Sequence, residues 1–329
     1  EYHYLLDLAL ILFTTKLFGL ISQKFKMPQV VGALLAGLIL GPAVLNIVQK
    51  SNFITTTSEI GVIILMFCAG LETDVKELKK CGKASFVIAL LGVIVPLLGG
   101  FGVAYFFNQP GIIDSGATCN VFLQNVFIGV ILTATSVSIT VETLKELGRL
   151  KSESGNAILG AAIIDDILGI IALTVITSLA DSSVNVWIVL LKILGFFAMV
   201  VVAGFAFYKL YVWWANRSKH LRHRHAIICF VFCLGMSYAA EALFGVADIT
   251  GAFFAGLIIS LTQSSEYLAK KFDVLSYLLL SPIFFASIGL NVVLPSMSVQ
   301  IIVFAVVITI VAIITKVCLL YTSDAADER

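Results

Sequence analysis

Long apolar runs separated by short polar segments dominate this 329-residue chain. Eleven of these runs approach the roughly 18–25 residues that a helix needs to cross the hydrocarbon core of a bilayer. They lie near residues 4–22, 28–46, 54–71, 84–107, 122–143, 154–180, 184–208, 226–244, 247–262, 274–292 and 298–317. Backbone groups in lipid must find hydrogen bonds within their own segment, so each run is predicted to be a helix. The pattern therefore predicts an all-α polytopic membrane protein with no soluble domain between its spans.

Composition supports this class and excludes others. Apolar residues make up 60% of the chain and charged residues only 12%, whereas ordinary soluble domains carry about 25% charged residues. This excludes a disordered chain and a soluble enzyme, and we expect neither enzymatic activity nor a cofactor. The net charge of +1 argues against a nucleic-acid partner.

Basic residues are distributed very unevenly between the two sets of loops. Loops after odd-numbered spans hold sixteen Lys and Arg, whereas loops after even-numbered spans hold Lys50 alone. The sixteen are Lys24, Lys26, Lys76, Lys79, Lys80, Lys83, Lys145, Arg149, Lys151, Lys209, Arg217, Lys219, Arg222, Arg224, Lys270 and Lys271. Cytoplasmic loops carry the excess of positive charge. We therefore predict cytoplasmic odd-numbered loops and an external N-terminus, in a plasma or inner cell membrane.

Two segments of the chain repeat each other at an offset of 219 residues. Residues 32–39 read Gly-Ala-Leu-Leu-Ala-Gly-Leu-Ile and residues 251–258 read Gly-Ala-Phe-Phe-Ala-Gly-Leu-Ile. The same offset relates Gly70 to Gly289. The second span starts in the cytoplasm and the ninth starts outside, so the two units run in opposite directions. Inverted repeats are typical of secondary transporters, and we predict repeats over about 28–180 and 247–317, the second incomplete.

The last twelve residues differ in character from the rest. From Cys318 they read Cys-Leu-Leu-Tyr-Thr-Ser-Asp-Ala-Ala-Asp-Glu-Arg, which resembles the translation of a transposase sequencing adapter. We expect a membrane domain over residues 1–317 and a non-native tail over 318–329. Completing the second repeat would require about two further spans.

Two adjacent carboxylates lie near the middle of the sixth span. An ionised carboxylate at the bilayer centre costs roughly 2.5–3.5 kcal/mol or more, so Asp165 and Asp166 must face water, a cation or a buried partner. Adjacent helical residues point about 100° apart, which predicts two different roles. Lys316 is the candidate partner, because the offset of 219 places it opposite Leu97 in the middle of the fourth span. The alternative is a lysine that extends to the membrane surface.

The fifth span contributes a dense group of hydroxyl side chains at Thr133, Thr135 and Ser136. Such hydroxyls often only bond back to their own helix. Where a helix is interrupted, however, hydroxyls and freed carbonyls can replace the hydration shell of a small cation. Beside two carboxylates, the second interpretation is favoured.

Several segments resemble the monovalent cation:proton antiporters of the Kef/NapA type. They are residues 133–140 and 158–169, Pro28 to Gly32, Gly41-Pro42, and Ser281 to Gly289. The similarity runs from about residue 5 to Val317. It implies a thirteen-helix inverted-repeat fold and a homodimer of the complete protein. It also implies a transport domain of spans 4–6 and 11–13, with spans 5 and 12 broken where they cross at the ion site.

The resemblance also implies residue roles. Asp166 matches the carboxylate that takes the cation or proton, and Asp165 matches one that pairs with a lysine at the position of Lys316. Relatives with Gln in place of the first Asp include glutathione-gated potassium efflux systems, so Asp165 favours the sodium/proton branch. The predicted ion- and proton-binding residues are Asp166, Asp165, Thr133, Thr135 and Ser136, with Lys316 as salt-bridge partner.

We therefore expect a secondary transporter that exchanges Na+ for protons, electrogenically if two acidic groups carry two protons. Exchange of K+ or Li+ and Kef-like potassium efflux stay open, because selectivity depends on cavity geometry. An organic-anion symporter of the same fold is a more distant alternative. A channel is disfavoured, because the sequence shows one polar layer rather than a continuous polar path. A subunit without transport activity would leave Asp165 and Asp166 unexplained.

Overall fold

The apolar runs fold into helices in the computed structural model, which describes residues 2–109, 120–180, 186–217, 222–262, 264–293 and 298–327. Within these ranges nine helices are long and apolar enough to cross a membrane. Two shorter apolar helices, α2 (Gln29–Leu40) and α11 (Asp248–Ser260), accompany them. The same ranges contain no β-strand. The predicted all-α fold is confirmed, and every predicted span contains one of these helices.

Contacts divide the chain into two compact units. Unit 1 comprises Glu1–Val75, Ser138–Lys151 and Phe196–Leu294, and unit 2 comprises Lys76–Val137, Ser152–Gly195 and Pro295–Arg329. Besides α2 and α11, unit 1 holds α1 (His3–Lys24), α3 (Asn52–Glu72), α10 (Arg222–Ala239), η1 (Ala240–Phe244), α12 (Ser265–Leu275), η2 (Ser276–Leu280) and α13 (Ser281–Leu290). Unit 2 holds α5 (Gly82–Phe107), α6 (Val121–Thr133), α8 (Glu153–Ala180) and α14 (Val299–Asp327). The remaining helices, α4 (Val75–Lys80), α7 (Val137–Glu146) and α9 (Val186–Arg217), have residues in both units, and all of α7 except Val137 belongs to unit 1.

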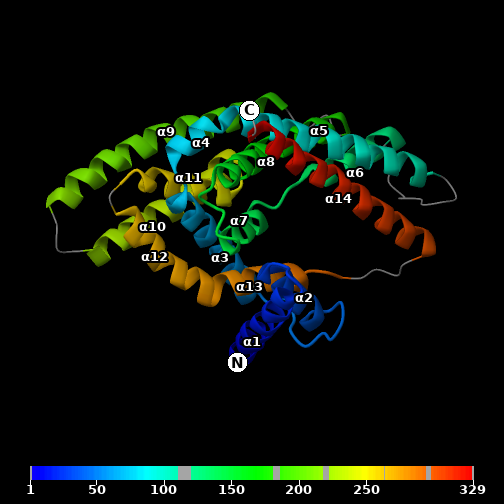
Figure 1. The fold of residues 1–329 in the computed structure, drawn as a ribbon, viewed down its shortest axis with the longest axis horizontal. Coiled ribbons are helices and arrows are strands. Elements are labelled where there is room, and N and C mark those ends of the chain that lie inside the picture. Colours follow the sequence, from blue (N-terminus) through cyan, green and yellow to red (C-terminus); the bar gives the residue numbers. More distant parts are fainter. Residues whose placement is uncertain are drawn as a thin grey trace. The chain divides into compact units, whose positions relative to one another are not determined.

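Unit 2 is organised around α5, which packs against α6, α8 and α14 (Figure 1). A Cβ atom on Gly100 would lie 2.8 Å from the Cα atom of Gly129, so α5 and α6 cross at closely approaching backbones. On α8, the Ala157 carbonyl accepts a hydrogen bond of 3.0 Å from the Ser85 hydroxyl of α5. Small residues at helix crossings are the usual solution in lipid, where burial of apolar surface gives no driving force. Unit 2 thus contains spans 4, 6 and 11 and the first half of span 5.

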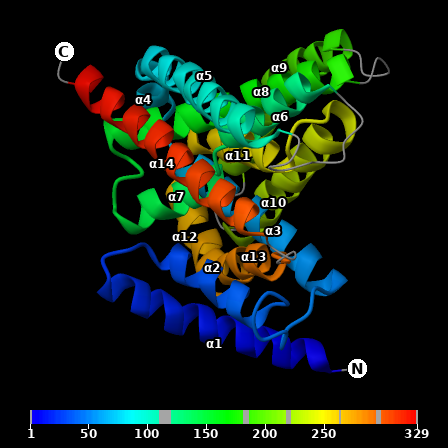
Figure 2. The same cartoon turned by 90° about the vertical axis from the view of Figure 1, so that its right-hand side faces the viewer.

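Unit 1 contains two helix pairs whose backbones nearly touch. A Cβ on Gly37 of α2 would lie 2.0 Å from the Ala286 carbonyl oxygen of α13, and a Cβ on Gly256 of α11 would lie 2.3 Å from the Phe67 carbonyl oxygen of α3. No side chain fits such spaces, so glycine is required at both positions. Figure 2 shows α2 beside α13, with α1 running along α2.

These close contacts are related by the repeat offset. Adding 219 to Gly37 gives Gly256, and subtracting 219 from Ala286 gives Phe67. The reciprocal contacts obey the same relation: a Cβ on Gly289 would lie 2.4 Å from the Leu34 carbonyl oxygen, and one on Gly70 would lie 2.2 Å from that of Phe253. This correspondence supports the predicted repeat, which stays a prediction for the chain as a whole.

Several predicted boundaries were wrong. The second span ends at Leu40 rather than near residue 46, because Pro42 disfavours helical backbone at Gly41. The tenth span begins at Ser265 rather than 274, so Lys270 and Lys271 lie on α12 and not in a loop. In the last span, α14 continues past residue 317. Lys219 and the final two residues of the predicted tail lie outside the described residues.

Candidate cation site

The fifth span is a broken helix. α6 ends at Thr133, and Ala134 leaves the helical region with φ −57° and ψ 127°. A second helix, α7, begins at Val137. A helix end leaves its last carbonyls without intrahelical donors. The Thr133 hydroxyl bonds back to the Val130 carbonyl at 2.7 Å, while the Thr133 carbonyl is directed to a donor from another helix. The break lies where the family resemblance implied one.

Lys316 of α14 supplies that donor. Its Nζ atom donates hydrogen bonds of 2.6 Å to the Thr133 carbonyl oxygen and 2.6 Å to Thr135 Oγ1. A third hydrogen bond of 3.3 Å goes to the Gly92 carbonyl oxygen of α5. The side chain is 28% exposed. Three neutral oxygens from two helices and the break therefore hold this ammonium group.

Asp165 and Asp166 lie in different surroundings on α8, as their angular separation predicted. Asp165 is 5% exposed, and neither of its carboxylate oxygens accepts a hydrogen bond from the described residues. Lys316 Nζ lies 3.9 Å from Asp165 Oδ2, which is the distance of an ion pair and too long for a direct hydrogen bond. Asp166 is half-buried.

Four of the six predicted residues are thus gathered in unit 2: Thr133, Thr135, Asp165 and Lys316. Asp166 is adjacent to them in sequence on α8, and Ser136 is an exposed residue at the end of the break. Carboxylates, hydroxyls and carbonyls freed by a broken helix are ligands that suit a small hard cation. In the described part of the chain, no group of three or more His, Cys, Asp or Glu could hold a metal ion.

Sequence reasoning did not find the oxygen of Gly92, although a signal was present. Pro96 follows Gly92 by four residues inside α5, and a proline within a helix frees the carbonyl four residues earlier.

A second charged cluster, also not predicted, lies in unit 1. Lys145 of α7 donates a hydrogen bond to Asp273 of α12 and lies 3.7 Å from Glu72 of α3. One residue further along α7, Glu146 accepts a hydrogen bond of 2.7 Å from the Gln29 backbone N–H at the start of α2. Glu72 is the last residue of α3. Its partner is 73 residues distant in sequence, and no local pattern reveals it.

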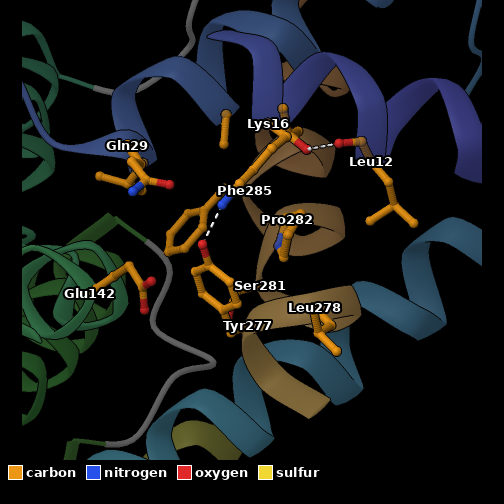
Figure 3. A pocket seen from close by; sticks show the side chains of 12 residues that line it. Leu12, Lys16, Gln29, Glu142, Tyr277, Leu278, Ser281, Pro282 and Phe285 are labelled. Carbon is orange, nitrogen blue, oxygen red and sulfur yellow. Dashed lines mark hydrogen bonds between the residues drawn. The ribbon is translucent and has the colours of Figure 1, made fainter. Parts of the chain in front are cut away.

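The cavity described in unit 1 is distinct from these predicted site residues. It has a volume of about 300 Å³ and is lined by α1, α2, α7, η2 and α13. Figure 3 shows Lys16 donating a hydrogen bond to the Tyr277 hydroxyl beside Phe285, with Gln29 and Glu142 at another side of the view. Its walls are mostly apolar, and it includes none of the residues gathered around Lys316.

A helical fold with many membrane-length spans, one of them broken beside a buried carboxylate and a lysine, defines a polytopic membrane transporter. The sequence model of the family described as "Sodium/hydrogen exchanger, transmembrane" matches residues 9–325. The chain therefore belongs to the sodium/hydrogen exchanger family.

Named relatives agree with this family. The chain is 39% identical over 313 residues to the "Probable Na(+)/H(+) antiporter GerT" of Bacillus cereus, covering 94% of this chain and 79% of the relative. It is 38% identical over 321 residues to the "Na(+)/H(+)-K(+) antiporter GerN" of the same species, covering 96% and 78%. It is also 38% identical over 319 residues to an Enterococcus hirae "Na(+)/H(+) antiporter", covering 94% and 78%.

One solved structure supports the fold. The sodium proton antiporter MjNhaP1 from Methanocaldococcus jannaschii superposes with a TM-score of 0.59 at 23% sequence identity, covering 86% of this chain and 69% of that one. At this identity the likeness concerns the fold alone.

Proposed function

We propose that this protein exchanges Na+ for protons across a cell membrane, at a site built from Asp165, Asp166 and the oxygens of the span-5 break. The observation that carries the proposal is the buried Asp165 carboxylate, which accepts no hydrogen bond among the described residues and lies 3.9 Å from the Lys316 ammonium group. Burying such a carboxylate costs free energy, and ionisable residues within membrane spans therefore mark functional sites. Membership of the sodium/hydrogen exchanger family supports the same reaction.

In the proposed mechanism, Asp166 carries either a proton or the cation. An arriving cation competes with the Lys316 ammonium group for the Thr133 carbonyl and the Thr135 hydroxyl, and Ser136 contributes a further hydroxyl at the rim. Cation arrival or protonation of Asp165 weakens the Asp165–Lys316 pair. Site occupancy is thereby linked to the conformational change that alternates access between the two sides of the membrane.

The finer features of the proposal come from the sequence. The split of basic residues supports cytoplasmic odd-numbered loops and an external N-terminus in a plasma or inner membrane. The repeat offset and the related glycine contacts support inverted repeats. The family resemblance supports a homodimer.

K+ is a second candidate substrate, because one relative at 38% identity is named a Na(+)/H(+)-K(+) antiporter. Parallel assays with Na+, K+ and Li+ distinguish the cations.

The substitution Asp166→Asn tests the proposal. We expect proton exchange driven by a Na+ gradient in reconstituted vesicles to fall by about two orders of magnitude or more, because an amide cannot carry the proton. Glu266→Gln is the control, since that carboxylate is highly exposed and pairs with Lys270 on its own helix. Wild-type exchange by folded Asp166→Asn protein would refute the proposal.

The charge balance of the cycle gives a second test. If both carboxylates carry protons, two protons move for each Na+ and the exchange is electrogenic. An imposed membrane potential should then change the exchange rate, and clamping the potential with valinomycin and K+ should remove the effect. Exchange that ignores the potential would contradict the two-proton cycle while leaving Asp166 as the carrier.

A further inference from the structure

The carbonyl oxygen of Gly92 is available because of a proline. Pro96 lies inside α5 and has no N–H, so the carbonyl four residues earlier lacks its helical donor. That carbonyl belongs to Gly92. An unmet carbonyl is expensive within a membrane, and here it accepts the 3.3 Å hydrogen bond from Lys316 Nζ.

The packing of α14 on α5 brings Lys316 to this carbonyl. A Cβ on Gly99 would lie 2.9 Å from Val311 Cγ1 and 3.1 Å from Thr315 Cγ2, so α14 approaches closely at this position. Gly92, Pro96 and Gly99 are spaced by four and three residues and therefore share one face of α5. The face that carries the freed carbonyl is thus the face against which α14 packs.

The corresponding positions of α14 show the opposite arrangement. The offset of 219 relates Gly92 to Val311 and Pro96 to Thr315. There the Thr315 hydroxyl donates to the Val311 carbonyl at 2.8 Å, an additional bond rather than a missing one. Of these two related carbonyls, only that of Gly92 has lost its intrahelical donor and can hold a group from another helix.

We propose that Pro96 is a positioning residue for Lys316 in cation exchange. By freeing the Gly92 carbonyl, Pro96 supplies the third oxygen that holds the ammonium group beside the Thr133 carbonyl and the Thr135 hydroxyl. This hold determines how strongly Lys316 competes with the cation for those two oxygens. The inference rests on the proposed function, because it assumes that the cation uses the same oxygens.

The substitution Pro96→Ala restores an N–H that can bond to the Gly92 carbonyl. Lys316 then loses one acceptor, and the Na+ concentration for half-maximal thermal stabilisation of the purified protein should fall about fivefold, the effect of one hydrogen bond. The apparent KM for Na+ in vesicles should fall in parallel with kcat unchanged. Gly102→Ala is the matched control: it also removes a poor helix former from α5, and its Cβ meets nothing within 4 Å.

Two further variants separate positioning from a general effect on α5. Lactic acid introduced at position 96 by nonsense suppression differs from alanine only in replacing the N–H by an ester oxygen. It should keep the wild-type Na+ midpoint. In a Lys316→Met background, Pro96→Ala should leave the midpoint of that background unchanged. Pro96→Thr adds a hydroxyl like that of Thr315 and should lower the Na+ midpoint at least as far as Pro96→Ala does. If the Pro96→Ala protein does not fold, Pro96→Thr takes its place in the test.

Three results would overturn the inference: alanine and lactic acid at position 96 shift the Na+ midpoint equally, Pro96→Ala shifts it by the same factor with and without Lys316, or neither folded Pro96→Ala nor folded Pro96→Thr shifts it. Failure of the proposed function has a different signature. Asp166→Asn protein would then exchange ions normally, while the shift of the Na+ midpoint caused by Pro96→Ala could still be compared with and without Lys316.

Discussion

The two units of this protein hold their charged side chains in contrasting ways. In unit 1, Lys145 meets the carboxylates of Asp273 and Glu72, so opposite charges neutralise one another. In unit 2, Lys316 donates its hydrogen bonds to neutral oxygens, and its ion-pair partner Asp165 lies 3.9 Å away, beyond direct hydrogen-bond distance. A lysine paired with two carboxylates is a structural anchor. A lysine held by neutral dipoles can give way to another cation, and its carboxylate stays available.

The same contrast extends to the backbone. Unit 1 contains glycine contacts that leave no room for a side chain, at Gly37 against α13 and Gly256 against α3. Unit 2 contains an interrupted helix after Thr133 and a proline inside α5. Tight crossings fix helices relative to one another, whereas interruptions expose carbonyls that can bind an ion. Unit 1 thus holds the tight crossings, and the proposed exchange site lies beside the interruptions of unit 2.

Substituting methionine for Lys316 and for Lys145 in separate variants gives the largest expected difference between the two units. Lys316→Met should change the apparent KM or kcat for Na+ by about tenfold or more, because the competing ammonium and the partner of Asp165 both disappear. Lys145→Met should leave the KM unchanged and lower the free energy of unfolding by about 1–2 kcal/mol, since two partly exposed carboxylates lose their cation. Vesicle kinetics and thermal unfolding measure the two effects. Equal kinetic defects would remove the distinction between anchor and exchange lysine.

The glycine crossings give a smaller effect, confined to stability. Gly37→Ala and Gly256→Ala should each lower the free energy of unfolding by about 1–3 kcal/mol, because an added methyl group overlaps a backbone carbonyl. Their similar surroundings predict similar losses. Gly235→Ala on α10 is the control, since its Cβ would meet nothing within 4 Å. If both variants were as stable as the control, these crossings would not be close contacts.

Much of the fold could be predicted from sequence, because the apolar composition of a segment is enough to indicate a membrane span. The runs around Asp165 and Lys316 were placed correctly, and Lys316, which the repeat offset places opposite Leu97, contacts the Gly92 and Thr133 carbonyls. The N-terminal part of α12 was missed because Lys270 and Lys271 interrupt its apolar pattern. The end of α2 was misplaced because the apolar run continues past the Gly41-Pro42 signal.

The candidate site was predicted less completely than the fold. Side chains that carry charge into lipid are conspicuous in sequence, so Asp165, Asp166 and Lys316 could be proposed from it, and the structure brings Asp165 and Lys316 within 3.9 Å. Backbone carbonyls are not conspicuous, and the oxygen of Gly92 becomes visible only when Pro96 is considered together with α14. The Lys145 cluster joins three helices that are far apart in sequence, and only tertiary structure brings them together.

The proposed mechanism requires that a proton and a cation compete for the same carboxylate site. Equilibrium binding of radioactive Na+ to the purified protein at a series of pH values tests it most directly. Competition predicts that the Kd for Na+ rises about tenfold or more for each unit that the pH falls below the titration of the site, and that Asp166→Asn abolishes binding at every pH. A Na+ affinity that does not change with pH, or that survives in Asp166→Asn, would contradict the account.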